Sequence, residues 1–385
     1  MSLRNLAYGV ADPGDGATVV VRVGDRVLPM IDAVREHASL AALVDGVNLD
    51  PLLAAGPPAW RELRARLAEH LADRPDGQAM THVDDVVMLL PFTVGDYVDF
   101  YSSLHHATNL GRIFRPDAEP LLPSWRHLPM GYHGRSGTVA VSGTPVRRPC
   151  GIVADGESVR RAPTAALDIE LEVGFVVGPG NRPGEPISPD DADRHVFGVV
   201  LVNDWSARDI QAFEYQPLGP FLGKSFLTTI SAWVVPLEAL TPHLVDPPVQ
   251  EPEPDPTLRA TRPWALALEL EVLLNGTSIC RTSFHDLYWT FAQQLAHLTS
   301  NGATTGPGDL FASGTVSGPE PGQYGSLIEL TWRGRDPVTL DDGTLRTWLE
   351  DGDVVELRGW CGDGDERIDL GPAVGSVLPA MELAG

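Results

Sequence analysis

The spacing of apolar residues along the chain predicts a protein built mainly from short strands. Branched residues recur over positions 16–28 and are interrupted at Gly24-Asp25, which predicts a β-hairpin. Continuous apolar runs at 196–202 and 230–236 are typical of buried strands. Residues 354–378 continue as short strands separated by glycine and aspartate. The 39 glycines and 34 prolines of the chain favour many turns over long helices.

Two segments have the apolar spacing of amphipathic helices, and we assign both to the core. Four apolar residues recur at helical intervals after a proline pair: Trp60, Leu63, Leu67 and Leu71. A longer stripe, which ends before Gly302, predicts the clearest helix of the chain: Phe284, Leu287, Tyr288, Phe291, Leu295 and Leu298. Residues 95–115 instead mix aromatics, acids and two histidines with little apolar periodicity, which predicts an ordered functional loop.

The chain divides into two predicted domains. Residues 1–90 form a small module that ends at a short apolar strand, and Pro91 begins a larger domain, 91–385. Within the larger domain, the proline- and acid-rich segment 246–256 predicts a surface loop.

Residues 167–173 alternate between acidic and aliphatic side chains, as in a strand. The acids of this run share one face: Asp168, Glu170 and Glu172. By pattern alone, this is a half-buried strand whose acids face water.

The segment 203–229, which lies between the two apolar runs, concentrates charged and aromatic residues. Its Ser206-x-x-Asp209 spacing is a helix-start signal, and Pro217 ends any helix that begins there. Such a helix places three polar side chains on one face, at i, i+3 and i+7: Arg208, Gln211 and Tyr215. That face would suit an anion or a carbonyl group. A solvated loop fits the same pattern, so both interpretations stand at this point.

Composition and charge narrow the function classes. A length of 385 residues, with 43% hydrophobic and 21% charged residues, suits a globular protein of two domains. The formal net charge of −24 argues against nucleic acid and anionic membranes as partners, but not against a small anionic substrate. The amino terminus lacks an apolar signal core and no run reaches membrane-spanning length, so we expect a cytoplasmic protein. Three cysteines, at 150, 280 and 361, lack redox or metal spacing and indicate inert thiols.

Carboxylates are the main chemical resource of the chain, because no nucleophile-elbow, zinc or phosphate-loop motif is present. If Glu170, Glu172, Asp204 and an acid from 96–99 converge, their repulsion requires bound protons or a cation. A cage made only of oxygen ligands selects a hard ion such as Ca²⁺ or Mg²⁺. A histidine beside the ion could then activate water, although a lone histidine such as His106 is also commonly structural.

Several long segments resemble the fumarylacetoacetate hydrolase family. They include DYVDFYSSLHHATN (96–109), LPMGYHGR (128–135), VLVNDWSARDIQAFEYQPLGPFLGKSF (200–226) and GDLFASGTVSG (308–318). The resemblance covers nearly the whole chain. It implies a mainly β (β-rich α+β) fold, with a small N-terminal SH3-like β-barrel domain and a larger C-terminal β-roll that carries the site and dimerises.

Matched position by position, the resemblance implies three sets of site residues. Four acids match divalent-metal ligands and two further residues lie near the metal: Asp99, Glu170, Glu172 and Asp204, with Lys224 and Thr228. His106 matches the general base and Glu329 the acid that orients it, while Arg208, Gln211 and Lys224 match groups that stabilise an oxyanion. The residues that match substrate contacts are Tyr101, Arg115, Tyr132, Arg208, Gln211, Tyr215 and Thr315.

The activity implied by the resemblance is hydrolysis of a carbon–carbon bond in a dicarboxylate β-diketone. The substrate would be fumarylacetoacetate, cleaved to fumarate and acetoacetate in the last step of tyrosine and phenylalanine catabolism, by a homodimer that uses Ca²⁺ and/or Mg²⁺. His105 beside His106 offers a second imidazole, but the match to HATN favours His106. Two alternatives are an acylpyruvate hydrolase or decarboxylase with the same metal site, and a non-catalytic metal-binding scaffold.

Overall fold

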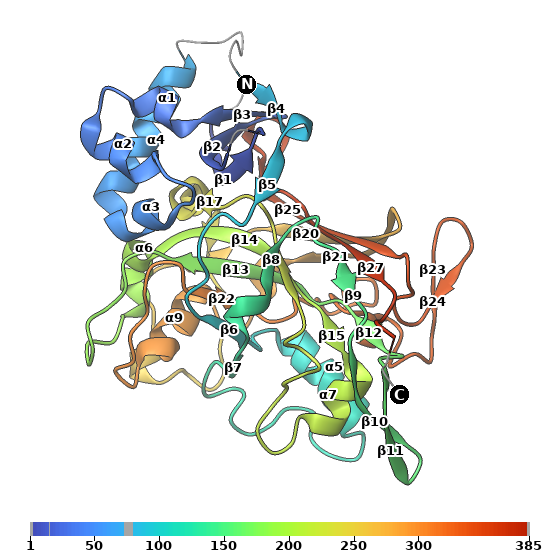
Figure 1. Cartoon of the computed structure of the whole chain (residues 1–385). Coiled ribbons are helices and arrows are strands. Elements are labelled where there is room, and N and C mark those ends of the chain that lie inside the picture. Colours follow the sequence, from blue (N-terminus) through green and yellow to red (C-terminus); the bar gives the residue numbers. More distant parts are fainter. Residues whose placement is uncertain (1–2, 15, 73–79, 383–385) are drawn as a thin grey trace.

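The computed structural model describes residues 3–14, 16–72 and 80–382, and the expected mainly β fold is confirmed (Figure 1). The N-terminal region contains a sheet with the strand order β4-β3-β2-β1-β5. Its strands are β1 (Ala7–Asp12), β2 (Thr18–Val23), β3 (Arg26–Pro29), β4 (Thr81–His82) and β5 (Val87–Leu89). The predicted hairpin joins β2 to β3, with Val23 opposite Arg26 and Gly24 at a positive φ of 63°.

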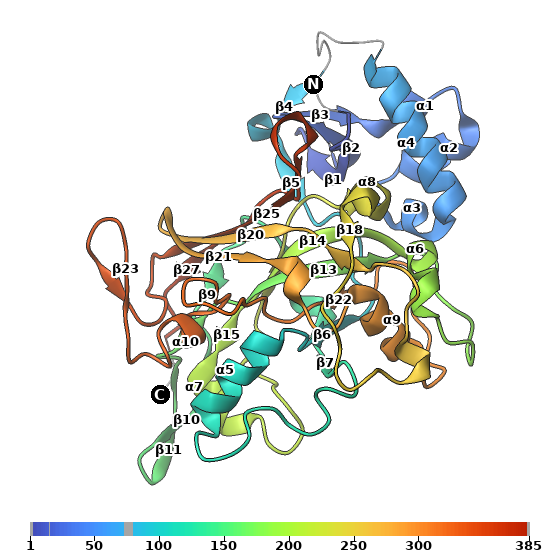
Figure 2. The same cartoon turned by 180° about the vertical axis from the view of Figure 1, so that it is seen from behind.

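Helices cover one side of the N-terminal sheet (Figures 1 and 2). They are α1 (Met30–Val34), α2 (Ala38–Val44), α3 (Asp50–Ala55) and α4 (Pro57–Ala72). The predicted helix at 57–72 is confirmed as α4, and its four apolar positions are buried. The apolar pattern did not predict α1 to α3, because helices of 5 to 7 residues are too short to show a period.

The central sheet of the larger part has the order β7-β6-β22-β13-β14-β16-β8, with β17 beside β14. Its strands are β7 (Gly131–His133), β6 (Tyr97–Phe100), β22 (Leu310–Ala312), β13 (Leu171–Val177), β14 (Val196–Asp204), β16 (Thr228–Ile230), β8 (Val139–Val141) and β17 (Val235–Pro236). Both faces of the sheet are covered. Val199 and Leu201 pack into one core while Val200 and Val202 pack into another, which explains the continuous apolar run of β14.

A second sheet packs on one face of the central sheet, and the N-terminal region lies on the other (Figure 2). The second sheet has the order β21-β20-β25-β27-β9, with β26 beside β25. Its strands are β21 (Thr277–Ser283), β20 (Glu269–Leu274), β25 (Val354–Cys361), β27 (Ala373–Leu378), β9 (Val146–Arg147) and β26 (Ile368–Asp369). Leu270 and Leu357 join the core shared with Val199, so the two sheets form a sandwich.

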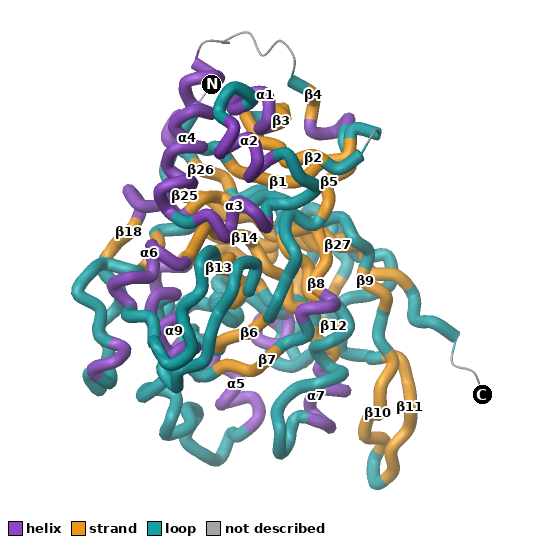
Figure 3. Tube along the Cα trace, turned by 60° about the vertical axis from the view of Figure 1, so that its left-hand side comes forward, coloured by secondary structure: helices purple, strands orange, loops and turns teal. Residues whose placement is uncertain are grey.

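Shorter elements connect and extend the two sheets. The hairpin of β10 (Cys150–Asp155) and β11 (Ser158–Pro163) projects from the end of the molecule farthest from the N-terminal region (Figure 3). The small strand pairs are β12 (Leu167–Asp168) with β15 (Ser206–Ala207), β18 (Leu244–Val245) with β19 (Ala265–Leu266), and β23 (Val338–Thr339) with β24 (Leu345–Arg346). The remaining helices are α5 (Leu104–Phe114), α6 (Ala192–His195), α7 (Arg208–Glu214), α8 (Leu237–Leu240), α9 (Phe291–Thr299) and α10 (Leu327–Leu330).

Three predictions about elements were wrong in detail. Residues 95–115 form β6 and α5 rather than a loop, and Ser103 caps α5 by accepting a hydrogen bond from the His106 backbone N–H. The stripe at 284–298 is helical only in α9, because Thr290 and Gln293 form a capping box that begins the helix there. The run at 230–236 is divided between β16 and β17.

Two further observations concern the described part of the chain. No helix within it is long and apolar enough to cross a bilayer. The cysteines at 150, 280 and 361 are free thiols in strands β10, β21 and β25; those at 280 and 361 are buried, whereas Cys150 is only half-buried.

Candidate active site

The four predicted metal ligands project from one face of the central sheet. Glu172 on β13 lies opposite Val202 on β14, and Asp204 follows Val202 by two residues on the same strand. Asp99 on β6 lies opposite Ala312 on β22. Because side chains on a strand alternate between faces, and Ala312 and Val202 belong to the same core, these acids share the face that is apolar farther along. Glu170 precedes Glu172 by two residues and falls on the same side.

The acids form a tight, buried cluster. One carboxylate oxygen from each acid lies within 4.8 Å of those of the others in the set Asp99, Glu170, Glu172 and Asp204, and all four side chains are buried. The expectation that acids from distant segments converge is therefore correct. The expectation that the acids of 167–173 face water is wrong, because all three are buried. Arg208 forms ion pairs with Asp168 and Glu170, and Glu172 lies within the acid cluster.

Two buried cations and a hydroxyl hold part of the cluster. Lys224 Nζ donates to Glu170 Oε2 at 2.5 Å and to Asp204 Oδ2 at 2.9 Å, and Thr228 Oγ1 donates to Asp204 Oδ1 at 2.9 Å. Arg208 Nη2 forms an ion pair with Glu170 Oε1 at 2.7 Å. Burial alone would raise the pKa of Glu170, but Lys224 and Arg208 outweigh burial and lower that pKa. Glu170 is therefore ionised.

The other two acids lack such support from the described residues. Asp99 Oδ1 and both carboxylate oxygens of Glu172 are buried and accept no hydrogen bond from that part of the chain. Burial, together with neighbouring carboxylates, raises the pKa values of Asp99 and Glu172 well above their usual range. Unpartnered carboxylate oxygens that face one another need protons or a cation, so this oxygen-only donor set fits a hard divalent ion.

A histidine–glutamate pair lies on two helices beside the cluster. His106, on α5, places Nδ1 2.6 Å from Glu329 Oε2, and Glu329 belongs to the short helix α10. Three further groups donate to Glu329: Asn109 Nδ2 at 3.0 Å, Ser317 Oγ at 2.9 Å and Ser326 Oγ at 2.7 Å. Burial alone would raise the pKa of Glu329, but His106 and these donors outweigh burial and lower that pKa.

A cavity of about 400 Å³ joins the cluster to the histidine. It is lined by eleven of the fifteen predicted site residues: Asp99, Tyr101, His106, Arg115, Tyr132, Glu170, Arg208, Gln211, Tyr215, Lys224 and Thr315. The other four lie directly behind this lining: Glu172 and Asp204 in the acid cluster, Thr228 on Asp204, and Glu329 on His106. Helices α5 and α7 lie at the end of the molecule that carries the site (Figures 1 and 2).

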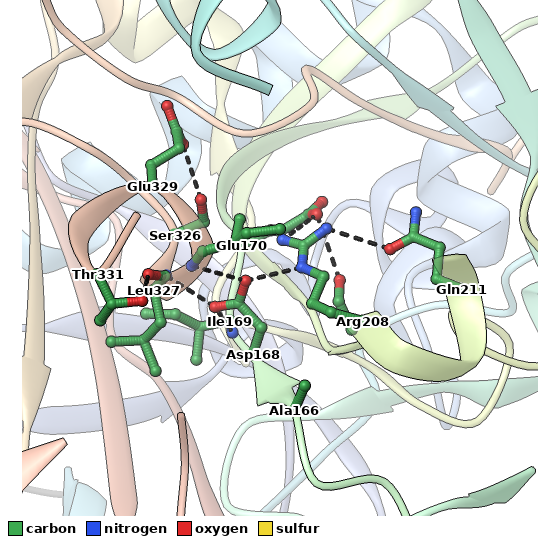
Figure 4. Close-up of polar contacts among 12 residues, drawn as sticks. Ala166, Asp168, Ile169, Glu170, Arg208, Gln211, Ser326, Leu327, Glu329 and Thr331 are labelled. Atoms are coloured by element: carbon green, nitrogen blue, oxygen red, sulfur yellow. Dashed lines mark hydrogen bonds and ion pairs between the residues drawn. The ribbon is translucent and has the colours of Figure 1, made fainter. Parts of the chain in front are cut away.

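The segment 203–229 contributes a helix rather than a solvated loop. Helix α7 begins at Arg208, and the three side chains at i, i+3 and i+7 all line the cavity. Arg208 Nη1 donates to Gln211 Oε1 at 3.2 Å, so the helix holds the two groups together (Figure 4). The three side chains therefore face one cavity, and their role in binding an anion or a carbonyl group stays a prediction.

Sequence reasoning missed several residues of the site. Leu110, Phe114 and Met130 supply apolar lining, and nothing in the pattern distinguishes them from core residues. The hydroxyl and amide donors around Glu329 were also missed, because they come from separate segments. Asp168 was noticed only as part of the alternating strand, yet it is fully buried and bonds Arg208.

The fold and the site together define a β-sandwich protein with a buried carboxylate cluster beside a glutamate-held histidine. The family described as Fumarylacetoacetate (FAA) hydrolase C-terminal matches residues 97–377, and that described as Fumarylacetoacetase N-terminal matches residues 4–91. The chain belongs to the fumarylacetoacetate hydrolase family.

Relatives cover almost the whole chain. The fumarylacetoacetases of Rattus norvegicus and Homo sapiens are each 45% identical to it, over 99% and 98% of this chain and 97% and 96% of theirs. That of Arabidopsis thaliana is 42% identical over 98% of this chain and 96% of its own. The division of the chain at residues 90 and 91 remains a prediction.

Solved structures of lower identity share the fold. The fumarylacetoacetate hydrolase of Exiguobacterium antarcticum superposes with a TM-score of 0.58 at 16% identity, over 97% of this chain and 99% of that one. The maleylpyruvate hydrolase of Sphingobium sp. SYK-6 was solved in complex with manganese(II) and pyruvate. It gives a TM-score of 0.55 at 13% identity, over 97% of this chain and 100% of that one.

Proposed function

We propose that this protein hydrolyses the carbon–carbon bond of fumarylacetoacetate to give fumarate and acetoacetate. The observation that carries this proposal is the cavity that joins the carboxylate cluster to His106, on a chain 45% identical to fumarylacetoacetases over nearly its full length. The cavity also contains Arg115, Arg208 and Lys224, which suits a substrate with two carboxylates.

A divalent cation, Mg²⁺ or Ca²⁺, would be held by Asp99, Glu170, Glu172 and Asp204. The oxygen-only donors and the unpartnered oxygens of Asp99 and Glu172 support a hard ion over zinc or copper. When bound, the ion supplies Lewis acidity toward the diketone oxygens and the departing enolate. Lys224 and Thr228 hold Asp204 and Glu170 in place for it.

His106 is the general base. Because its Nδ1 faces the ionised Glu329, the neutral ring carries its proton there, and Nε2 is the nitrogen that can take a proton from water in the cavity. The resulting hydroxide attacks the carbonyl carbon of the fumaryl group, which is one end of the carbon–carbon bond that breaks. Glu329 keeps the ring oriented and stabilises the imidazolium that forms, as a buried acid does for a catalytic histidine.

The tetrahedral alkoxide lies near the cationic side of the cavity. Arg208 and Lys224 offer positive charge, and Gln211 offers an amide N–H. When the carbon–carbon bond breaks, the electron pair goes to the acetoacetate fragment as an enolate, and the oxygen from water stays in the new carboxyl group of fumarate. The imidazolium then returns its proton to the enolate carbon, which becomes a methyl group.

Arg115, Tyr101, Tyr132, Tyr215 and Thr315 would bind and orient the substrate. Burial raises the pKa values of Tyr101 and Tyr132, so both phenols remain protonated donors. Tyr132 donates to Asp204 Oδ2 at 2.8 Å, which places this ring between the substrate and the acid cluster. Arg115 Nη2 donates to the Pro120 carbonyl at 2.7 Å, which leaves the other guanidinium edge for a carboxylate.

The test compares two adjacent histidines by following loss of the diketone absorbance. His106→Asn should lower kcat by about 10³-fold or more, since it removes the proposed base. His105→Asn, the matched control, should leave kcat unchanged, because His105 is absent from the cavity lining. Equal activity of His106→Asn and wild type would refute catalysis by His106, and faster turnover of an acylpyruvate would reassign the substrate.

We propose in addition that the protein is a cytoplasmic homodimer. The segment 213–222 supports dimerisation, because it exposes large apolar side chains, with Leu218 96% and Phe221 60% exposed. The three free cysteines suit a reducing compartment. Light scattering of the purified protein measures the dimer directly.

A further inference from the structure

Asp168 is a buried acid that lies outside both the cavity lining and the four-acid cluster. Its side chain is fully buried, and it accepts hydrogen bonds from two directions (Figure 4). From one side, Arg208 Nε donates to Oδ2 at 2.7 Å. From the other, the backbone N–H of Leu327 donates to Oδ1 at 2.7 Å and that of Ile328 to Oδ2 at 3.1 Å. Both carboxylate oxygens are therefore used.

The first contact sets the plane of the Arg208 guanidinium. Arg208 has Nε on Asp168, Nη2 paired with Glu170 and Nη1 on Gln211 (Figure 4). Because a guanidinium is planar, a carboxylate that binds Nε at one edge determines where the opposite edge points. Asp168 therefore aims Arg208 toward the cavity and toward Glu170.

The second contact holds helix α10, which carries Glu329. Ser326 occupies the N-cap position of α10 but makes no side-chain capping bond, and its hydroxyl donates instead to Glu329 Oε2. The first N–H groups of a helix have no partner within it. Asp168 supplies those partners from β12, 159 residues away along the chain. A helix of 4 residues has little stability alone, so this bond fixes its position.

We infer that Asp168 is a positioning residue that couples the oxyanion side of the site to its proton-transfer pair. A single carboxylate orients Arg208 and, through its bonds to the first N–H groups of α10, also sets the distance between Glu329 and His106. This inference rests on the proposed function, because it assigns those groups to one reaction. Arg208 and the His106–Glu329 pair are then aligned with each other by one buried carboxylate.

The competing explanation is that Asp168 only stabilises the fold, as a buried ion pair can. Asp353 provides a matched control, because it is 2% exposed and bonds an arginine and a backbone N–H in the same way. Arg346 Nε donates to Asp353 Oδ2 at 3.0 Å and the Glu350 N–H donates at 2.7 Å. Asp353 immediately precedes β25 and lies outside the cavity lining.

The first experiment compares Asp168→Asn with Asp353→Asn in the metal-loaded protein. Asp168→Asn should lower kcat by about 10²-fold, the scale of losing one oxyanion donor, with KM little changed. Asp353→Asn should leave kcat unchanged, although both variants lower Tm. If Asp168→Asn keeps wild-type kcat, or if Asp353→Asn loses as much activity, the inference fails.

A spectroscopic readout separates this inference from the proposed substrate. The short bond between His106 Nδ1 and Glu329 should give a far-downfield proton resonance, assigned by its loss in His106→Asn. Asp168→Asn should shift or broaden that resonance, while Asp353→Asn should retain it. An unchanged resonance in Asp168→Asn overturns the coupling. A wild-type protein that fails to cleave fumarylacetoacetate overturns the proposed function and leaves this test in place.

A second pair of variants avoids changing Asp168, in case Asp168→Asn does not fold. Leu327→Pro and Leu327→Ala both remove the buried leucine side chain, but only the proline also removes the N–H that binds Asp168. Proline is tolerated at this first helical position. Leu327→Pro should lose the downfield resonance of the His106–Glu329 proton. Its kcat should be about tenfold lower than that of Leu327→Ala, because one net hydrogen bond is worth about that factor. Equal behaviour of the two variants contradicts the inference.

Discussion

At the scale of single residues, Asp99 and Glu172 differ from the other acids of the site. Glu170 and Asp204 are bonded to Lys224, whereas both oxygens of Glu172 accept no hydrogen bond from the described residues. Burial and the neighbouring carboxylates raise the pKa values of Asp99 and Glu172, so their ionised forms are costly until a cation offsets the charge. The cluster is therefore a site where protons and metal compete.

This competition predicts how metal stabilisation depends on pH. In metal-free protein, the folded-state pKa values of Asp99 and Glu172 lie above their unfolded values. Their contribution to stability is then present at low pH and is lost as pH rises through those raised values. Because bound metal replaces the protons, adding Mg²⁺ or Ca²⁺ to chelated protein should raise Tm more at about pH 8 than at about pH 6.

Differential scanning calorimetry of the chelated protein, with and without metal, measures this effect. Glu172→Gln removes one of the two competing groups, so the rise in Tm on adding metal should be smaller and depend less on pH. Chelation should also abolish turnover, and Mg²⁺ or Ca²⁺ should restore it. A rise in Tm that is the same at both pH values would show that these carboxylates do not bind the metal.

The residue scale also shows the limit of pattern reasoning. Alternation placed Asp168, Glu170 and Glu172 on one face, but a period of two cannot tell whether that face is exposed to water or buried. Glu329 is 223 residues from His106, so only tertiary structure or a family resemblance brings them together. Long matched motifs supplied that resemblance. Asp168 was missed because its partners, the Arg208 side chain and two backbone N–H groups of α10, come from segments 40 and about 160 residues away.

At the scale of elements, helix α5 illustrates why a functional helix escaped detection. It carries two buried polar residues, His106 and Asn109, which both bond Glu329, so its apolar stripe is broken. The stripe at 284–298 failed in the opposite way. Its residues 284, 287, 288, 291 and 295 are buried as predicted. Residues 284–286, however, form a 3₁₀ turn, and the α-helix begins only at Phe291. Burial can repeat without a continuous helix.

A glycine on α5 sets the position of the proposed carboxylate ligand Arg115. A Cβ added at Gly111 would lie 2.0 Å from the Pro120 carbonyl oxygen, the same oxygen that accepts from Arg115 Nη2 at 2.7 Å. Gly111→Ala must therefore displace Pro120. We expect KM for fumarylacetoacetate to rise about tenfold or more, because a lost hydrogen bond between Arg115 and a substrate carboxylate costs about that factor. The change in kcat should be smaller.

Steady-state kinetics of two glycine variants measure this effect. Gly46→Ala is the matched control, because it is exposed and its nearest contact for an added Cβ is 3.9 Å away. It should leave both KM and kcat unchanged. If Gly111→Ala keeps the wild-type KM, the loop from Arg115 to Pro120 does not position the guanidinium for substrate.

At the scale of the whole molecule, the two predicted domains share a core. Phe197, on β14 of the central sheet, has its ring centroid 5.1 Å from that of Trp60 on α4 and 6.1 Å from that of Tyr8 on β1. Tyr8 also pairs with Val234 through backbone hydrogen bonds of 2.8 and 2.7 Å. The short apolar strand before Pro91 indicated a boundary near residue 90, but it could not show that the N-terminal region packs on one face of the central sheet.

The shared core predicts that the two parts unfold together. Phe197→Ala should destabilise the protein by about 3–5 kcal/mol, the cost of emptying a buried aromatic site, and calorimetry should still show a single transition. Leu345→Ala is the control, because Leu345 is 55% exposed and its loss should change stability little. Hydrogen exchange in α4 and in β25 should accelerate equally in Phe197→Ala, since both exchange through one global opening. Faster exchange confined to α4 would instead show that the N-terminal region opens by itself, and that the acid cluster keeps its scaffold when that region unfolds.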